Sequence, residues 1–277
     1  MKITILGASG FIGSHLVSYL REKQIDYWAP KRNDATIYKR NLNHVIYCIG
    51  LTADFRTRPF ETIDAHVCLL SKILKQCKFD SFLYLSSTRI YGTGEGIARE
   101  ENVIKIQPLD FNDLYNISKA MGESICFAAG KANVRTVRLS NVYGCDFESE
   151  NFISSLIRDA LRNKKIRLHT SLDSSKDYIN IKDVVAILPE IAVHGSHKIY
   201  NVASGENITN SKIINILKRL TNCTIEIDKN AKRILYPNIS VSRVKEEFAF
   251  IPSRIIEDLN ELVSRYYDFM ERKNDKG

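Results

Sequence analysis

The sequence lacks both a long apolar run and paired cysteines. No stretch of the 277-residue chain approaches the ~20 apolar residues needed to cross a bilayer. Its apolar start runs straight into glycines, without the small-residue cleavage site of a signal peptide. We therefore expect a cytoplasmic protein that is neither secreted nor embedded in a membrane. The six cysteines contain no C-x-x-C pair, so neither a disulfide framework nor a metal site is predicted.

Long basic tracts are also missing, although the net charge is +8. The basic residues lie in short, separated groups, without an aromatic-basic motif of the RNA-binding kind, which argues against a nucleic-acid partner. A metabolite that carries phosphate groups is one partner that such charge favours. A solvated surface that happens to be basic is the alternative.

Apolar strand patterns alternate with helical patterns along the first half of the chain. Strands are predicted at residues 2–6, 27–29, 45–49, 82–85, 134–139 and 198–202, with helical spacing near residues 12–20 and 63–74. This alternation predicts an α/β fold with a doubly wound parallel sheet, the Rossmann type. The link from residue 30 to residue 44 is short for a crossover helix, so we expect that side of the sheet to be thinly covered.

Mixed helical patterns follow at residues 152–161, 211–220 and 255–270, after the regular alternation has ended. We assign them to a smaller mixed C-terminal substrate domain that packs over the open end of the sheet. The predicted dinucleotide-binding domain spans residues 1–145, with returning segments at about 176–203. The predicted substrate-binding domain spans residues 146–175 and 204–277.

A glycine-rich turn directly follows the first strand and precedes the first helix. The run Gly7-Ala8-Ser9-Gly10-Phe11-Ile12-Gly13 has G-x-x-G-x-x-G spacing. Glycine lets the backbone turn tightly and approach a pyrophosphate, and the helix N-terminus offers unpaired N–H groups to phosphates. The predicted cofactor-binding residues are therefore Gly7, Ser9, Gly10, Phe11, Ile12 and Gly13.

Lys31 and Arg32 stand at the end of the second strand, where dinucleotide folds usually carry an acidic residue. Two cations would attract a 2′-phosphate, so the sequence favours NADP over NAD as the cofactor. A solvated turn without such a role is the alternative for both residues.

Tyr115 and Lys119 are four residues apart in a helical segment, which sets both side chains on one helix face. An ammonium near a phenol lowers the phenol's pKa, so that the tyrosine can exchange a proton with a substrate oxygen near neutral pH. The fourth strand ends in Ser86-Ser87-Thr88, whose hydroxyls could hold the same oxygen. The glycine turn, the hydroxyls and the Tyr/Lys helix occur in that order, and this joint occurrence gives the signal its strength.

With these motifs, the sequence resembles the extended short-chain dehydrogenase/reductase family over residues 1–266. The family's nucleotide-sugar enzymes include 4-epimerases, 4,6-dehydratases and 4-keto reductases. By this resemblance Ser87 is the catalytic Ser/Thr and Tyr115 is the general acid/base. Lys119 would tune the tyrosine and bind the nicotinamide ribose, so Tyr115 and Lys119 also count as cofactor-binding residues.

Three later segments resemble family motifs: Arg138 to Gly144, Lys176 to Val184 and Tyr200 to Gly205. The resemblance implies substrate contacts from Thr88, Asn141, Lys176, Tyr178 and Arg233. The sequence also departs from the family pattern. Lys176 replaces an arginine, His66 stands where an asparagine is common, and the phosphate contact expected near Arg233 is not cleanly present. Thr88 and Arg89 occupy the places of the acidic pair in family dehydratases, which disfavours dehydration.

The first hypothesis is an NADPH-dependent 4-keto reductase of a deoxysugar nucleotide. A nucleotide-sugar 4-epimerase with bound NAD uses the same residues and is the close alternative. A non-catalytic dinucleotide sensor or scaffold is an alternative of another class, disfavoured because Tyr115 and Lys119 are both present. By analogy with the family we also expect a homodimer that contacts through two helices flanking the sheet, including the one that bears Tyr115.

Overall fold

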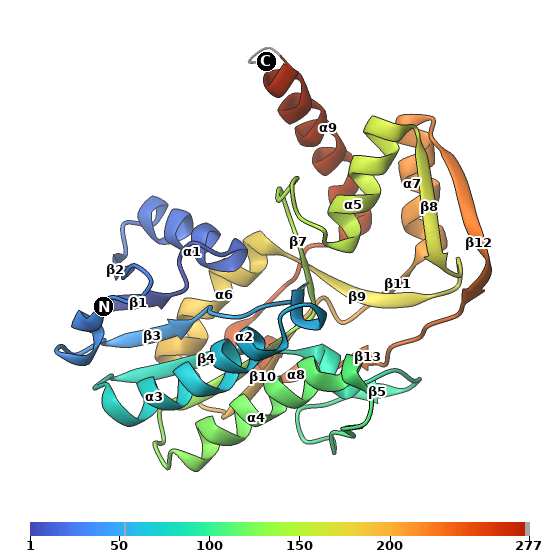
Figure 1. Ribbon diagram of the computed structural model, residues 1–277. Helices are drawn as coiled ribbons and strands as arrows, with labels where there is room; N and C mark the ends of the chain where they lie inside the picture. Colours follow the sequence, from blue (N-terminus) through green and yellow to red (C-terminus); the bar gives the residue numbers. More distant parts are fainter. Residues whose placement is uncertain (53, 275–277) are drawn as a thin grey trace.

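A six-stranded parallel sheet forms the centre of the molecule, with the strand order β10-β6-β4-β3-β1-β2 (Figure 1). The computed structural model describes residues 1–52 and 54–274 of the chain. The chain starts in β1, adds β2 on one side, and then continues on the other side with β3, so that strand order reverses between β1 and β3. Ligands bind outside the carboxyl ends of the strands at such a switch point. The strands are β1 (Lys2–Leu6), β2 (Asp26–Trp28), β3 (His44–Tyr47), β4 (Ser81–Ser87), β6 (Val134–Leu139) and β10 (Ile199–Val202).

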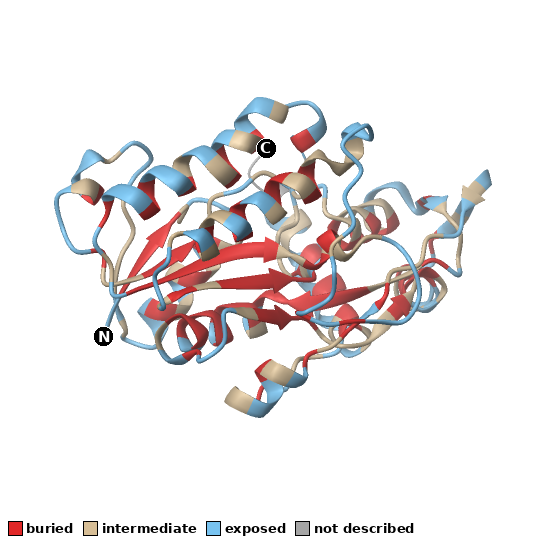
Figure 2. Ribbon diagram, turned by 90° about the horizontal axis from the view of Figure 1, so that it is seen from below, coloured by how far each residue is buried: buried red, intermediate tan, exposed pale blue. Residues whose placement is uncertain are grey.

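Helices cover both faces of this sheet, and Figure 2 shows the buried strands as a layer between helices whose outer sides are exposed. One face carries α1 (Phe11–Glu22) and α6 (Ile181–His194); the other carries α3 (Leu69–Gln76) and α4 (Leu114–Ala128). In β4, Leu83 and Leu85 pack toward the first face, whereas Phe82 and Tyr84 pack toward the second. Because both faces are buried, the strand reads as a continuous apolar run. The predicted doubly wound parallel sheet is confirmed.

The link between β2 and β3 contains only one 3₁₀ turn, η1 (Ala35–Tyr38). Ile37 and Leu42 bury their side chains against the second helical face, and the Thr4 hydroxyl donates a hydrogen bond to the Leu42 carbonyl oxygen at 2.5 Å. The expected absence of a full crossover helix here is confirmed. The next predicted helix is longer than expected and contains a π-helical turn: α2 (Pro59–Ile63), η3 (Asp64–Cys68) and α3 run on without a break.

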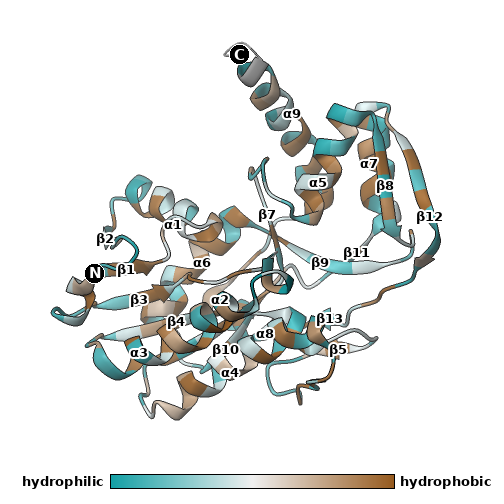
Figure 3. Ribbon diagram, viewed as in Figure 1, coloured by the Kyte–Doolittle hydropathy of each residue, from teal (hydrophilic) through white to brown (hydrophobic). Residues whose placement is uncertain are grey.

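A second layer with its own hydrophobic cluster lies beyond the carboxyl end of the sheet. Figure 3 shows hydrophobic residues on the packed sides of α5 (Phe152–Arg158) and α7 (Asn210–Thr221) in this layer. Within the described residues, no helix combines the length and apolar character that crossing a bilayer requires. The layer and its margins comprise β7 (Asn141–Tyr143), α5 (Phe152–Arg158), η6 (Asp159–Asn163), β8 (Lys165–Thr170), β9 (Ser175–Asn180), β11 (Asn207–Thr209), α7 (Asn210–Thr221), β12 (Thr224–Lys232) and α9 (Ile255–Asn274). The short pair β5 (Ile97–Ala98) and β13 (Asn238–Ile239), with α8 (Ser242–Phe248), lies near β10.

The returning segment expected at about 176–203 divides between the two layers. Its first part, β9, pairs with β7 and β11 in a small mixed sheet. Its remainder, α6 and β10, packs on or joins the central sheet. The domain boundaries themselves stay a prediction.

Candidate active site

A cavity of about 780 Å³ lies at the carboxyl ends of the central strands, between the two layers. Ten of the predicted site residues line it: Gly10, Phe11, Ile12, Ser87, Thr88, Tyr115, Lys119, Asn141, Lys176 and Tyr178. Six others do not appear in its described lining: Gly7, Ser9, Gly13, Lys31, Arg32 and Arg233. The volume is within the range of small-molecule sites.

Two glycines of the turn are required by the protein's own packing. Gly7 has φ = +91°, and a Cβ there would lie 2.8 Å from the Ile49 nitrogen. A Cβ on Gly13 would lie only 2.2 Å from the Gly7 carbonyl oxygen. Both residues therefore set the strand-to-helix turn without bordering the cavity.

Gly10 differs, because a Cβ there would meet its nearest neighbour, the Gly7 carbonyl oxygen, at an ordinary 3.5 Å. It caps α1 with its backbone alone, and the first turn of that helix contains no acidic residue. The N–H groups at this end and the helix dipole therefore meet no carboxylate in the first turn. The residues fit a phosphate-bearing cofactor at the point where Gly10, Phe11 and Ile12 face the cavity.

Lys31 and Arg32 are exposed in the loop after β2 and lie outside the described lining of the cavity. The nearby Trp28 ring is covered by Arg40, whose guanidinium carbon is 4.5 Å from the ring centroid. A role of Lys31 and Arg32 toward a 2′-phosphate therefore stays a prediction.

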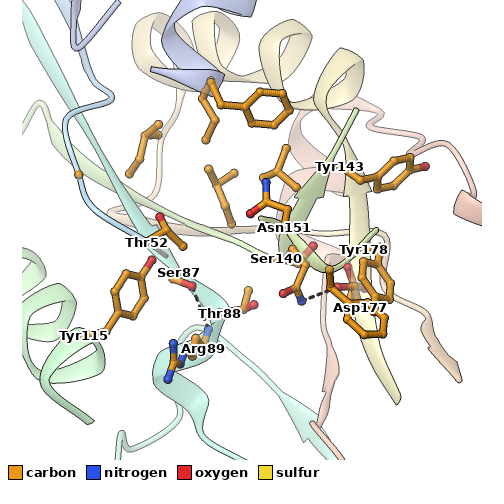
Figure 4. A pocket seen from close by; sticks show the side chains of 18 of the residues that line it. Thr52, Ser87, Thr88, Arg89, Tyr115, Ser140, Tyr143, Asn151, Asp177 and Tyr178 are labelled. Carbon is orange, nitrogen blue, oxygen red and sulfur yellow. Dashed lines mark hydrogen bonds between the residues drawn. The ribbon is translucent and has the colours of Figure 1, made fainter. Parts of the chain in front are cut away.

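Tyr115 is nearly fully buried at the start of α4, and its phenol points toward Ser87 and Thr52 (Figure 4). The Ser87 and Thr52 side chains both hydrogen-bond the phenol. Burial raises the pKa of Tyr115, whereas these two hydrogen bonds and the charge of Arg89 act to lower it. The predicted convergence of Tyr115 with Ser87 is therefore present, and Thr52 joins it.

Lys119 lies one helical turn further along α4, with its Nζ 5.9 Å from the centroid of the Tyr115 ring. Its Nζ donates a hydrogen bond to the Leu85 carbonyl oxygen at 2.8 Å. Burial lowers the pKa of Lys119 to about 7, although Glu123 acts to raise it. The sequence predicts that Lys119 lowers the pKa of Tyr115. In the structure burial instead raises the pKa of Tyr115, and Arg89 is the cation that acts to lower it.

His66 forms hydrogen bonds both to α4 and to the loop that carries Thr52. The Leu51 N–H donates to His66 Nε2 at 3.2 Å, so Nδ1 carries the proton that is shared with Ser118 Oγ at 2.8 Å. Ser118 Oγ donates in turn to the Tyr115 carbonyl oxygen at 2.8 Å. Burial lowers the pKa of His66 to about 2, with a smaller contribution from Lys119, so the ring is neutral.

A buried ion pair fixes the next turn of α4 to the sheet. Arg138 on β6 donates from Nε and Nη2 to the two carboxylate oxygens of Glu123, at 2.9 and 2.7 Å. Both side chains are at most 4% exposed. This bidentate pair sets the position of the helix that carries Tyr115 and Lys119.

The opposite wall of the cavity is built by β7 and β9 (Figure 4). Lys176 lies with its Nζ 4.4 Å from the Phe152 ring centroid, and burial with the charge of Arg89 lowers its pKa to about 8. The Asn141 amide donates to the Asp177 carbonyl oxygen at 2.8 Å. Tyr178 also lines this wall, and among the described residues its buried hydroxyl has no hydrogen-bond partner.

Arg233 is exposed at the end of β12 and does not line the cavity in the described residues. Tyr236 and Pro237, a few residues later, line it instead. Sequence reasoning also missed Thr52, Arg56 and the role of Arg89 as a neighbour of Tyr115. The available signal was that Thr52 and Arg56 follow β3 and that Arg89 follows β4.

The comparisons with known proteins concern the family and the fold. The model of the NAD dependent epimerase/dehydratase family matches residues 3–203. A dTDP-D-glucose 4,6-dehydratase of Dictyostelium discoideum is 27% identical over an alignment of 269 positions, which covers 78% of this chain and 62% of the dehydratase; the match thus spans less than two thirds of that relative. A GDP-6-deoxy-D-mannose reductase of Pseudomonas aeruginosa is 27% identical over an alignment of 262 positions, which covers 84% of each chain. A dTDP-4-dehydro-6-deoxyglucose reductase of Escherichia coli is 24% identical over an alignment of 305 positions, which covers 92% of this chain and 94% of that one.

Solved structures share the fold over nearly the whole chain. MoeE5 in complex with UDP-glucose and NAD superposes with a TM-score of 0.82 at 19% identity, covering 98% of this chain and 99% of that one. RMD from Pseudomonas aeruginosa in complex with NADPH superposes with a TM-score of 0.78 at 22% identity, covering 96% and 99%.

Proposed function

The chain belongs to the NAD dependent epimerase/dehydratase family, and we propose that it is an NADP(H)-dependent oxidoreductase that reduces the 4-keto group of a deoxysugar nucleotide. The family membership expected from the motifs is thereby confirmed. The observation that carries the proposal is the hydrogen-bonded Tyr115 phenol, with Ser87 and Lys119, in a cavity that also contains the N-terminus of α1.

The cofactor-binding roles follow from which residues face the cavity. Gly10, Phe11 and Ile12 would hold the pyrophosphate at the start of α1, and Lys119 would bind the nicotinamide ribose. Lys31 and Arg32 would contact the 2′-phosphate of NADP, while NAD stays the alternative. When bound, the nicotinamide supplies a hydride to the ring carbonyl carbon.

Tyr115 would transfer its phenolic proton to the carbonyl oxygen as that oxygen gains negative charge, leaving an alcohol. Ser87 and Thr52, which already hydrogen-bond the phenol, would hold the substrate oxygen in line with it. On the opposite wall, Lys176, Asn141 and Tyr178 would bind the nucleotide's diphosphate and the sugar.

Two observations favour reduction among the activities of the relatives. Two of the relatives described above carry the names of reductases of 6-deoxysugar nucleotides. The cavity offers Thr88 and Arg89, not two carboxylates, at the end of β4, although a dehydratase is among the relatives. A 4-epimerase with tightly held NAD is the alternative, because it needs the same Tyr115, Ser87 and Lys119.

The deciding experiment incubates the purified protein with NADPH and 4-keto-6-deoxysugar nucleotides carrying either GDP or dTDP. A reductase consumes one NADPH for each 4-keto group reduced. An epimerase instead carries NAD through purification and interconverts nucleotide-sugars without added reductant. A protein that binds NADPH and whose cellular role survives Tyr115→Phe would be a sensor or scaffold.

We further propose a cytoplasmic homodimer that contacts through α3 and α4. The partial exposure of Met121 on α4, at 50%, is consistent with an outer face of that helix that can meet a second copy. Size-exclusion chromatography with light scattering measures the molar mass and therefore the oligomeric state.

A further inference from the structure

Arg89 is held against the ring of Tyr115. It follows Ser87 by two residues, in the 3₁₀ turn η4 (Thr88–Tyr91) at the end of β4. Its guanidinium carbon is 5.3 Å from the Tyr115 ring centroid and 4.9 Å from that of Phe55. Its Nη2 donates to the Asn112 carbonyl oxygen at 3.4 Å, and its backbone N–H donates to Ser87 Oγ at 3.2 Å. Contacts on several sides therefore fix the guanidinium beside the phenol.

The charge of Arg89 has no carboxylate partner within residues 1–52 and 54–274. None of the ion pairs between described residues includes it. A carboxylate paired with Arg89 would cancel much of the field at the phenol. Without one, the charge acts on Tyr115 and on Lys176 across the cavity.

The titratable groups beside the phenol on α4, η3 and β4 are either neutral or change their charge near neutral pH. On α4, Lys119 loses its charge near neutral pH because burial lowers its pKa to about 7. On η3, the ring of His66 is 5.5 Å from that of Tyr115 and is neutral. On β4, the buried Tyr84 carries no charge at neutral pH because burial raises its pKa. Asp54 and Arg56 from η2 (Asp54–Arg56) also line the cavity, with charges of opposite sign.

A guanidinium keeps its charge at every pH at which the protein is folded. We propose that Arg89 is a positioning residue that stabilises the Tyr115 phenolate and so sets the pH at which this tyrosine exchanges its proton. The inference deepens the proposed function and rests on Tyr115 as the general acid/base. It also gives a role to Arg89, which occupies one of the two places where the family's dehydratases carry acidic residues.

The test compares the pH profile of wild type with those of Arg89→Gln and Arg89→Lys in the alcohol-oxidising direction. This direction needs the phenolate, so activity rises with pH as Tyr115 loses its proton. In Arg89→Gln the rising limb moves to higher pH, and kcat at pH 7 falls about tenfold, the scale of effect of one neighbouring cation. In Arg89→Lys the limb stays close to that of wild type, because the charge is kept. Arg89→Met replaces the Gln variant if the latter does not fold.

Arg56→Gln is the matched control. Arg56 also stacks on Phe55, at 4.4 Å, and donates to the Asn112 side chain at 2.8 Å, but within the described residues neither a ring contact nor a hydrogen bond joins it to Tyr115. The rising limb of the pH profile of Arg56→Gln is therefore expected in the same pH range as that of wild type. An equal shift in Arg56→Gln and Arg89→Gln would overturn the inference, since it would indicate a general effect of positive charge at the cavity.

A readout without substrate separates this inference from the proposed function. The absorbance of the Tyr115 phenolate is isolated by subtracting the titration of Tyr115→Phe from that of wild type, and likewise in the Arg89→Gln background. If the Tyr115 phenol loses its proton at a higher pH in Arg89→Gln, the inference is supported, even if no nucleotide-sugar is turned over. In that case only the proposed function fails. Titration at the same pH in both backgrounds overturns the inference, whatever the activity.

Discussion

The cofactor end and the substrate end of the cavity are built in opposite ways. At the cofactor end, residues 10–12 follow one another at one strand-to-helix turn. At the substrate end, the described lining comes from Thr52, Arg89, Asn141, Lys176 and Tyr236, each on a different segment. The first can be recognised in a short stretch of sequence, whereas the second depends on how distant segments pack. The five predictions below test this contrast, from the largest expected effect to the smallest.

Tyr115→Phe should lower kcat by ~10²- to 10⁴-fold, the usual contribution of a positioned general acid, while cofactor affinity stays unchanged. NADPH oxidation gives the rate and NADPH fluorescence gives the affinity. Tyr91→Phe is a suitable control, because this phenol bonds Asn201 and Arg138 away from the described lining of the cavity. Equal losses of kcat in both variants would mean that Tyr115 has only a structural role.

Glu123→Gln should lower the free energy of unfolding by ~3–5 kcal/mol, because it leaves Arg138 buried without its charge partner. Loss of this ion pair would weaken the packing of α4, which carries Tyr115 and Lys119 in the cavity. Urea denaturation measures the free energy of unfolding. Glu261→Gln, which removes an exposed partner of Arg265, should change stability by less than ~1 kcal/mol. Similar losses in the two variants would contradict a special role of the buried pair.

Gly13→Ala and Gly10→Ala should separate packing from ligand binding within the glycine turn. The Gly13 methyl meets the Gly7 carbonyl oxygen at 2.2 Å, so we expect a loss of ~1–3 kcal/mol in stability. The Gly10 methyl meets no described chain atom closer than 3.5 Å, so stability should be kept while cofactor affinity falls. Thermal melting with and without NADPH distinguishes the two, and an unchanged NADPH response in Gly10→Ala would refute the cofactor assignment.

Replacing Lys31 and Arg32 with serine should lower the preference for NADPH over NADH by roughly tenfold, the order expected from losing charged contacts to one phosphate. The ratio of kcat/KM for the two cofactors is the measurement. The affinity for NADH should stay constant, since the change concerns only the 2′-phosphate. A preference that does not move would leave both residues as an ordinary solvated turn.

Lys176 should make substrate binding depend on pH at the substrate end. Its pKa is lowered to about 8, so it is charged below that pH and loses its proton as the pH rises. KM for an anionic nucleotide-sugar should therefore rise by a few-fold above about pH 8, while KM for the cofactor stays level. Lys176→Arg should remove this rise, because arginine keeps its charge. A KM that is equally pH-dependent in Lys176→Arg would point to another group.

The parts that could be predicted from sequence are those with a local physical cause. The strand at Val134–Leu139 and the helices around residues 152–161 and 211–220 follow from apolar spacing, which the chain shows without reference to distant segments. Arg233 illustrates the limit. The family resemblance implied a substrate contact for it, whereas the structure leaves it exposed directly after β12 and outside the described lining, and Tyr236 lines the cavity.

The pKa values show the same limit. Y-x-x-x-K spacing correctly sets Tyr115 and Lys119 on one face of α4, but spacing carries no information on burial. Desolvation raises the pKa of Tyr115 and lowers that of Lys119, because both side chains are buried where α4 packs against β4, η3 and η4.

The sequence by itself determined the parallel sheet, the glycine turn and the order of the tyrosine, lysine and strand-end hydroxyls, because apolar periodicity, backbone freedom at glycine and helical spacing act over a few residues. Only the tertiary structure decided that Thr52, Arg89 and Lys176 share one cavity with Tyr115. These residues lie on separate elements, and their charges act through space over distances that only the packed chain sets.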